Sequence, residues 1–172
     1  MGELEFEDSM RSWTTKQQTM AKIFDKYCNS MKVRSLKWYF PTGSKWAMRK
    51  INKFMAFFAI PLKLWDVVAF LDTTTFRTGK EGMLFTKDGI FIKEALNKLY
   101  YIAYEKVEKA EIIEKFDDAG YLVSSELYVH YKDGTKQLVF DYDIRKLFFA
   151  EYINDVAEYL RTGYFKAAVE EE

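Results

Sequence analysis

The spacing of hydrophobic residues changes near residues 61–66 of the chain. Before this point, apolar residues recur every three or four positions, which is the period of a helix with one buried face. After it, short β-branched and aromatic runs are separated by turn residues, as in a strand-rich domain. The change predicts a basic helical part over residues 1–62, followed by a second domain over 63–172.

Two helices are predicted in the N-terminal part. The first spans 8–31, with Asp8 or Ser9 as its cap, because a short oxygen-bearing side chain satisfies free amides of the first turn. The second spans 45–59, begins after the cap Ser44 and ends before Pro61. Its apolar and basic residues fall largely on different faces. The apolar set is Ala47, Met48, Ile51, Phe54, Met55 and Phe58, and the basic set is Lys45, Arg49, Lys50 and Lys53.

This second helix has two interpretations. A helix with basic residues opposite Phe and Met is the kind that lies on membrane surfaces or binds partner proteins. A helix docked on the core of its own protein shows the same pattern. We favour docking, because the apolar face is bulky and the strands that follow need covering.

Short strands and tight turns are predicted from residue 67 onward. Two Asp-Gly pairs, Asp88-Gly89 and Asp133-Gly134, indicate hairpins, because a tight hairpin turn needs positive φ angles that these residues tolerate. Residues 117–120 form a further turn. The strand segments are 67–75, 83–86, 90–93, 121–131 and 136–140.

A final helix is predicted over 144–160, with Asp141 or Asp143 as its cap and Gly163 as its stop. Its expected core stripe is Ile144, Leu147, Phe148, Tyr152, Val156 and Leu160. Residues 94–116 are ambiguous. Their Glu, Ala, Leu and Lys favour one long helix, whereas 99–102 and 107–113 favour two strands.

Composition limits the chemistry. With 172 residues, 49% apolar and 18% aromatic, the chain is expected to fold around a packed core. Cys28 is the only cysteine and His130 the only histidine, so an internal disulfide and zinc sites built on Cys or paired His are excluded. A lone thiol and the absence of a secretory signal or an uninterrupted apolar span predict a soluble cytoplasmic protein.

The charge is partitioned along the chain. Residues 9–65 hold twelve Lys or Arg and one acid, a net of +11, whereas 66–172 carry a net of −7. The basic segment is a candidate surface for anionic lipid, nucleic acid or an acidic partner. Alternatively, it lies against the acidic half of the same chain or of a second copy, which we favour. The candidate anionic-surface residues are Arg34, Lys37, Lys45, Arg49, Lys50 and Lys53.

Catalytic motifs are not found, so an enzyme is not expected, and neither is a cofactor or a metal. No phosphate-binding glycine loop or nucleophile elbow is present. The carboxylates of Asp117, Asp118, Asp141 and Asp143 fall at a turn and a helix start, where acids stabilise free amides. Basic and aromatic residues alternate over 32–40, as in nucleic-acid binding proteins, but a hydrophobic strap across the core is the favoured interpretation.

The segments 82–93 and 102–107 resemble strands of the bacterial pleckstrin-homology-like proteins, and the resemblance covers about residues 67–160. It implies an α+β fold, with a seven-stranded antiparallel barrel or split sheet capped by a C-terminal helix. It therefore favours two strands within 94–116. Lipid-binding relatives use basic residues in their first hairpin loops, and the matching positions here are Arg77, Lys80 and Lys87.

The resemblance implies binding without catalysis. We therefore expect a non-enzymatic interaction module that binds a protein partner or itself. The alternative is peripheral binding to anionic lipid through the basic helix 45–59.

Overall fold

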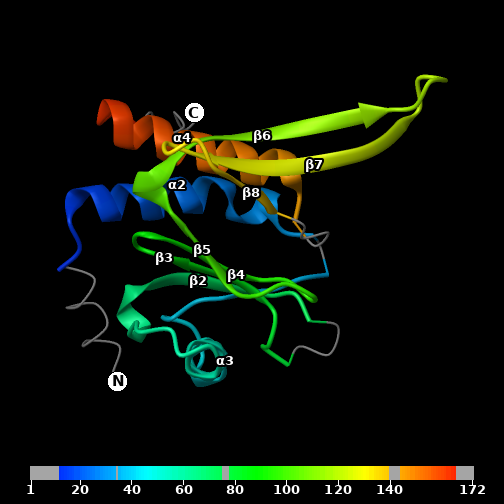
Figure 1. Ribbon diagram of the computed structural model, residues 1–172. Coiled ribbons are helices and arrows are strands. Elements are labelled where there is room, and N and C mark those ends of the chain that lie inside the picture. The colour runs from blue at the N-terminus through cyan, green and yellow to red at the C-terminus, as the bar shows by residue number, and fades with distance from the viewer. Residues whose placement is uncertain (1–11, 34, 75–77, 140–143, 166–172) are drawn as a thin grey trace, which may run out of the picture. The chain divides into compact units, whose positions relative to one another are not determined.

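The computed structural model describes residues 12–33, 35–74, 78–139 and 144–165 (Figure 1). It is an α+β structure with two antiparallel sheets and a C-terminal helix. The chain divides into two units, Met1–Ala21 with Arg34–Ala103, and Lys22–Val33 with Tyr104–Glu172. The predicted division into domains at residue 62 remains a prediction.

The sheet of the first unit has the strand order β1-β2-β3-β4-β5, and every neighbouring pair is antiparallel. β2 to β5 follow one another along the chain, whereas β1 comes from the N-terminal part and pairs with β2. The strands are β1 (Trp38–Tyr39), β2 (Val67–Asp72), β3 (Gly82–Thr86), β4 (Gly89–Lys93) and β5 (Tyr100–Ala103). The 3₁₀ turn η1 (Leu64–Asp66) leads into β2.

The second unit combines a three-stranded sheet with a helix. Its strands, in the order β6-β7-β8, are β6 (Val107–Phe116), β7 (Leu122–Tyr131) and β8 (Lys136–Val139). The 3₁₀ turn η2 (Tyr104–Lys106) precedes β6, and α4 (Lys146–Thr162) packs against β6. Residues 94–116 therefore contain two strands, as the resemblance favoured. The described strands form two separate sheets rather than one closed barrel.

The first described helix, α2 (Thr15–Met31), begins later than expected. Thr14 accepts a hydrogen bond from the backbone amide of Gln17 at 3.1 Å, and the Gln17 side chain accepts one from the Thr14 amide at 3.0 Å. This reciprocal capping box starts the helix at Thr15, so the prediction of a continuous helix from Asp8 is wrong. The expected caps Asp8 and Ser9 lie outside the described residues.

The helix α3 (Lys45–Phe57) confirms the predicted cap, since the Ser44 hydroxyl accepts from the Ala47 amide at 3.2 Å. Its apolar face is buried in a core with β2 and β3 residues, which confirms the docked interpretation. Ile51 and Phe54 are fully buried there, and the Phe54 ring packs at a tilt against Phe70 of β2 with ring centroids 4.7 Å apart. Because the apolar face of α3 is buried, the opposite face of the helix remains exposed.

Gly89 confirms the expected hairpin between β3 and β4, but for a different reason than the predicted one. Its φ angle is not positive. A Cβ at this position would instead lie 2.3 Å from the backbone oxygen of Ile102 in β5. Gly is needed because the β5 backbone approaches too closely for a side chain. At the second Asp-Gly turn, Gly134 has φ +88°, as a tight turn requires.

The buried stripe of α4 differs from the prediction. Leu147 is exposed, and Leu160 is only partly buried. The buried positions of the helix are Phe149, Ala150, Tyr152, Ile153 and Val156. The helix begins at Lys146 after Arg145, without a side-chain cap, and the expected caps Asp141 and Asp143 lie outside the described residues. Gly163 ends α4 with φ +72°, as predicted.

No helix among the described residues is both long and apolar enough to cross a membrane.

Candidate interaction surfaces

The strands β6 and β7, of ten residues each, form a hairpin whose two halves have different surroundings. Near its base, Ala110, Leu127 and Val129 are buried, and α4 packs on this part. Toward the turn, every residue from 114 to 123 is exposed. Figure 1 shows the hairpin extending beyond α4. The distal half is therefore supported by its own cross-strand pairing and not by a core.

Asn154 of α4 holds the base of this hairpin. Its side-chain oxygen accepts from the Ala110 amide at 2.7 Å, and its nitrogen donates to the Ala110 carbonyl at 3.0 Å. β6 is an edge strand, so these backbone groups have no strand partner on that side. One side chain thus satisfies both outward backbone groups of Ala110.

Replacing Asn154 by Ala should lower the free energy of unfolding by about 1–3 kcal/mol, because two hydrogen bonds to the strand are lost. The amide of Ala110 should also exchange its hydrogen faster, which NMR measures directly. Glu151→Ala, one turn earlier on an exposed position, should leave both quantities unchanged. Unaltered Ala110 exchange in Asn154→Ala would contradict the anchoring role.

The turn at the end of the hairpin is ordered by Asp117. Its carboxylate accepts from the backbone amides of Ala119 at 3.0 Å and Tyr121 at 2.8 Å. Its own backbone amide donates to the Tyr121 carbonyl at 2.8 Å, and Gly120 supplies the positive φ angle of +84°. The predicted turn over 117–120 is confirmed, and it holds the residues on either side in fixed positions.

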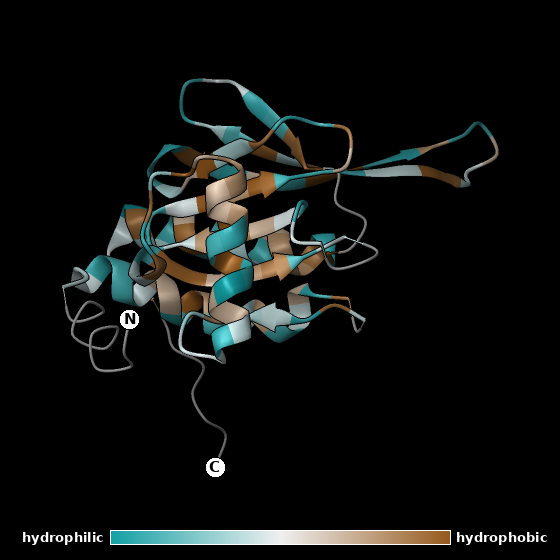
Figure 2. Cartoon of the chain, turned by 90° about the horizontal axis from the view of Figure 1, so that it is seen from below, coloured by the Kyte–Doolittle hydropathy of each residue, from teal (hydrophilic) through white to brown (hydrophobic). Residues whose placement is uncertain are grey.

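Four large apolar side chains project at this turn, and we call them the hairpin tip: Phe116, Tyr121, Leu122 and Val123. Their exposed fractions are 58%, 73%, 55% and 66%. Phe116 lies opposite Leu122 in the ladder, whereas Val123 points to the other face because side chains alternate along a strand. The tip is therefore apolar on both faces, and Figure 2 shows brown, hydrophobic residues near the end of this hairpin.

Charged side chains surround the tip. Glu114, Asp117 and Asp118 are exposed, and Lys115 lies 3.6 Å from Glu126 on the neighbouring strand. A hydrogen bond from the Tyr128 hydroxyl at 2.7 Å lowers the pKa of Glu126. The tip thus carries an excess of negative charge around its apolar side chains.

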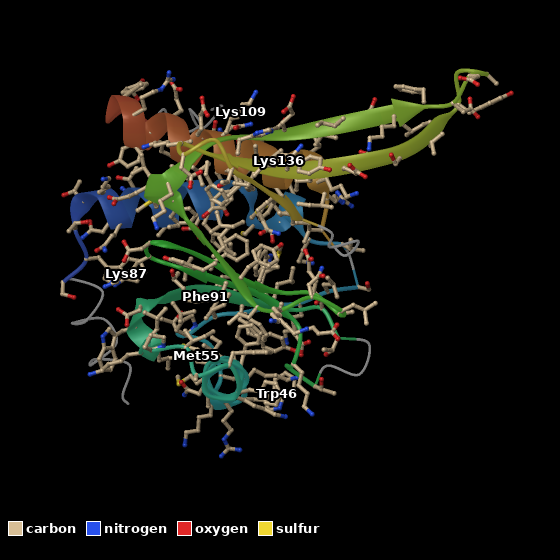
Figure 3. The ribbon with its side chains drawn as sticks, in the orientation of Figure 1. Trp46, Met55, Lys87, Phe91, Lys109 and Lys136 are labelled. Atoms are coloured by element: carbon tan, nitrogen blue, oxygen red, sulfur yellow. The ribbon has the colours of Figure 1, made fainter. Side chains whose placement is uncertain are left out.

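The predicted anionic-surface residues do not all form one surface. Lys45, Arg49 and Lys53 are exposed on the outer face of α3, and Lys37 is exposed next to β1. Figure 3 shows nitrogen-tipped side chains leaving α3 on the side away from the sheet. Arg34 lies outside the described residues. Lys50 is the exception, because it is buried.

Lys50 is part of a buried network and is not a surface residue. Its Nζ lies 3.0 Å from Oδ2 of Asp72, whose carboxylate also accepts from the amides of Gly79 and Thr74 and from the Thr74 hydroxyl. The network joins α3 to the segment that follows β2. Lys50 is therefore not exposed with the other predicted residues, because the helix turns this position toward the core.

Two exposed aromatic residues, Trp46 and Phe57, accompany the basic residues of α3. The exposed fraction is 50% for Trp46 and 58% for Phe57. Trp46 packs edge-on against the Tyr39 ring at 5.3 Å, and the Lys80 ammonium lies over the Phe57 ring at 5.5 Å. Neither residue is among the predicted anionic-surface residues, although helical spacing places both on the same side as Arg49 and Lys53.

The basic loop positions implied by the resemblance are not gathered into one site. Lys80 is exposed, whereas Lys87 is paired with Asp66 at 3.1 Å. Arg77 lies outside the described residues. No cluster of metal-ligating side chains occurs within the part of the chain that the structure describes.

Three further titratable side chains, His130, Cys28 and Tyr152, contact neighbouring residues or are buried. The His130 ring lies 2.8 Å from Glu111 across the β6–β7 ladder. Burial raises the pKa of the Cys28 thiol, which therefore stays protonated. The hydroxyls of Tyr104 and Tyr152 are hydrogen-bonded in the interior of the second unit, and burial raises the pKa of Tyr152.

A cleft of about 460 Å³ lies between α4 and the start of β6. Its charged side chains are of both signs and include Lys109, Lys132 and Glu108, with Arg161 paired to Glu158. The mixed lining favours no ligand of one charge.

No family model, curated protein or solved structure matches this chain.

Proposed function

We propose that this protein is a non-enzymatic interaction module that binds a protein partner through the hairpin tip. The observation that supports this proposal is the exposure of Phe116, Tyr121, Leu122 and Val123. They lie at the end of a hairpin in which every residue from 114 to 123 is exposed. Apolar side chains gathered on a soluble surface are a feature of binding sites. The hydrophobic effect favours their burial by a partner.

The order of elements supports a pleckstrin-homology-like scaffold. β2 to β5 and β6 to β8 form two successive antiparallel groups, and α4 follows them. This is the order of a split seven-stranded sheet with a C-terminal helix, to which β1 adds an edge strand. We infer a bacterial cytoplasmic setting from the resemblance and from the single thiol of Cys28.

The chemistry of the tip defines the partner. Phe and Tyr side chains bury large areas and favour an apolar pocket. The neighbouring acids Glu114 and Asp118 favour a basic rim around that pocket and disfavour an anionic membrane. The Asp117 turn holds the tip in place before binding, which reduces the ordering cost of association.

Replacing all four tip residues by Ser should abolish partner binding while leaving the fold intact, because each of these side chains is more than half exposed. The measurement compares the proteins captured from the native cell by the wild type and by this tip variant. A partner held by the tip should be lost at least ten-fold, since buried aromatic contacts contribute about 2 kcal/mol or more each.

The matched control is Leu96→Ser with Leu147→Ser, which removes exposed apolar side chains elsewhere on the chain. It should capture the same partner as the wild type. Sedimentation of each variant over a range of concentrations measures self-association. If only the tip variant is monomeric, the partner is a second copy of the chain. Equal capture and equal mass for the tip variant and the control would contradict the proposal.

A further inference from the structure

We propose that the outer face of α3 binds an anionic phospholipid surface. The site consists of Lys45, Trp46, Arg49, Lys53 and Phe57, which we call the α3 ridge. This inference does not depend on the hairpin tip, which lies in the other unit of the chain.

The docking of α3 determines what the ridge displays. Ala47, Ile51, Phe54 and Met55 are buried in the core of the first unit. Lys45, Arg49 and Lys53 follow one another at four-residue intervals on the opposite side and are all exposed. In Figure 2, teal positions recur along this helix. The three cations therefore form one row on a helix that is held in place from behind.

No acid among the described residues pairs with the cations of the ridge, Lys45, Arg49 and Lys53. Residues 26–65 contain no Asp or Glu. Asp72, the carboxylate that contacts α3, is already paired with the buried Lys50. A row of unpaired cations attracts an anionic surface.

Two further cations lie next to the ridge. Lys80 approaches the Phe57 ring, and Lys37 lies over the Tyr39 ring, which contacts Trp46. Both lysines are exposed. They add positive charge beside Trp46 and Phe57, the two aromatic residues of the ridge.

The aromatic residues favour a lipid surface over other anionic partners. Trp46 and Phe57 stand eleven residues apart and are each at least half exposed. Trp is enriched at membrane interfaces, where its ring lies at the level of the headgroups. Lys45, Arg49 and Lys53 lie in a row along one exposed face of the helix. Such a row suits mobile headgroups better than one rigid ligand.

The test is co-sedimentation of the full chain with vesicles of phosphatidylcholine alone or with one third phosphatidylserine. We expect binding to the anionic vesicles only, and weaker binding as salt is raised. Replacing Lys45, Arg49 and Lys53 together by Gln should reduce the partition coefficient on the order of 100-fold, since each basic residue contributes about five-fold.

The matched control replaces Lys98, Lys106 and Lys132 by Gln, which removes the same charge from exposed positions outside α3. It should bind as the wild type does. Anionic vesicles should also shift the Trp emission of the wild type to the blue, and Trp46→Phe should remove that shift. Absent binding, equal binding to neutral vesicles, or equal losses in the two triple variants would each overturn the proposal.

Discussion

Lys50→Met should lower the free energy of unfolding by about 3–5 kcal/mol. The substitution leaves the Asp72 carboxylate, only 1% exposed, without the ammonium 3.0 Å away. Uncompensated charge in the interior is costly, because the medium around it solvates ions poorly. Urea unfolding followed by Trp fluorescence measures the effect. All four Trp residues lie in the first unit, so the signal reports on this unit.

The control for this effect is Lys53→Met on the same helix. Lys53 is exposed and has no ion-pair partner among the described residues, so its replacement should change the unfolding free energy by no more than about 0.5 kcal/mol. Adding Asp72→Asn to Lys50→Met should recover much of the loss, because the unpaired charge disappears. Equal effects at positions 50 and 53 would show that the helix is rotated differently.

Phe54→Ala should cost a similar amount, about 3–5 kcal/mol, by opening a cavity between α3 and β2. The Phe54 side chain is fully buried and contacts the rings of Phe70 and Phe58. The same Trp-detected unfolding measures the change. The result tests the docked face of α3, on which the exposure of the α3 ridge depends.

Phe57→Ala is the matched control, because the same side chain is removed from the exposed face of the same helix. It should lower the unfolding free energy by less than about 1 kcal/mol, the scale of a surface substitution. A large loss at Phe57 with a small one at Phe54 would contradict the orientation of α3.

The strands could be predicted because their signals are local. The Asp-Gly pairs at 88–89 and 133–134 and the turn at 117–120 lie between apolar runs, and each gave a hairpin in the structure. Propensity alone was ambiguous over 94–116, because helix-forming Glu, Lys and Ala occur in β6 beside its β-branched residues. Packing and cross-strand pairing decided that segment, and they do not follow from single-residue preference.

The sequence-based predictions of burial were wrong where contacts in the folded chain determine which side chains are buried. Basic residues of α3 looked equivalent in the sequence, but the helix places Lys50 toward Asp72, twenty-two residues away. In α4, Leu147 and Phe149 are equally hydrophobic candidates for the core, and only Phe149 is buried. The start of α2 was a missed local signal, since Thr14 and Gln17 have the spacing of a capping box.

Only part of each candidate surface could be predicted from the sequence. The turn at Asp117 was predicted, but the exposure of Phe116 and Leu122 depends on where α4 stops covering β6 and β7. An apolar residue in a strand is normally assigned to a core. These residues form a surface because the hairpin extends beyond the part that α4 covers.

Site-specific photo-crosslinking in the native cell tests the role of the hairpin tip most directly. A benzophenone side chain replaces Tyr121 at the tip or, as the matched control, Tyr164, which has a similar exposed fraction of 68% against 73%. We predict that illumination joins a protein covalently to position 121 and not to position 164. Adducts at neither position, or the same adducts at both, would contradict binding through the hairpin tip.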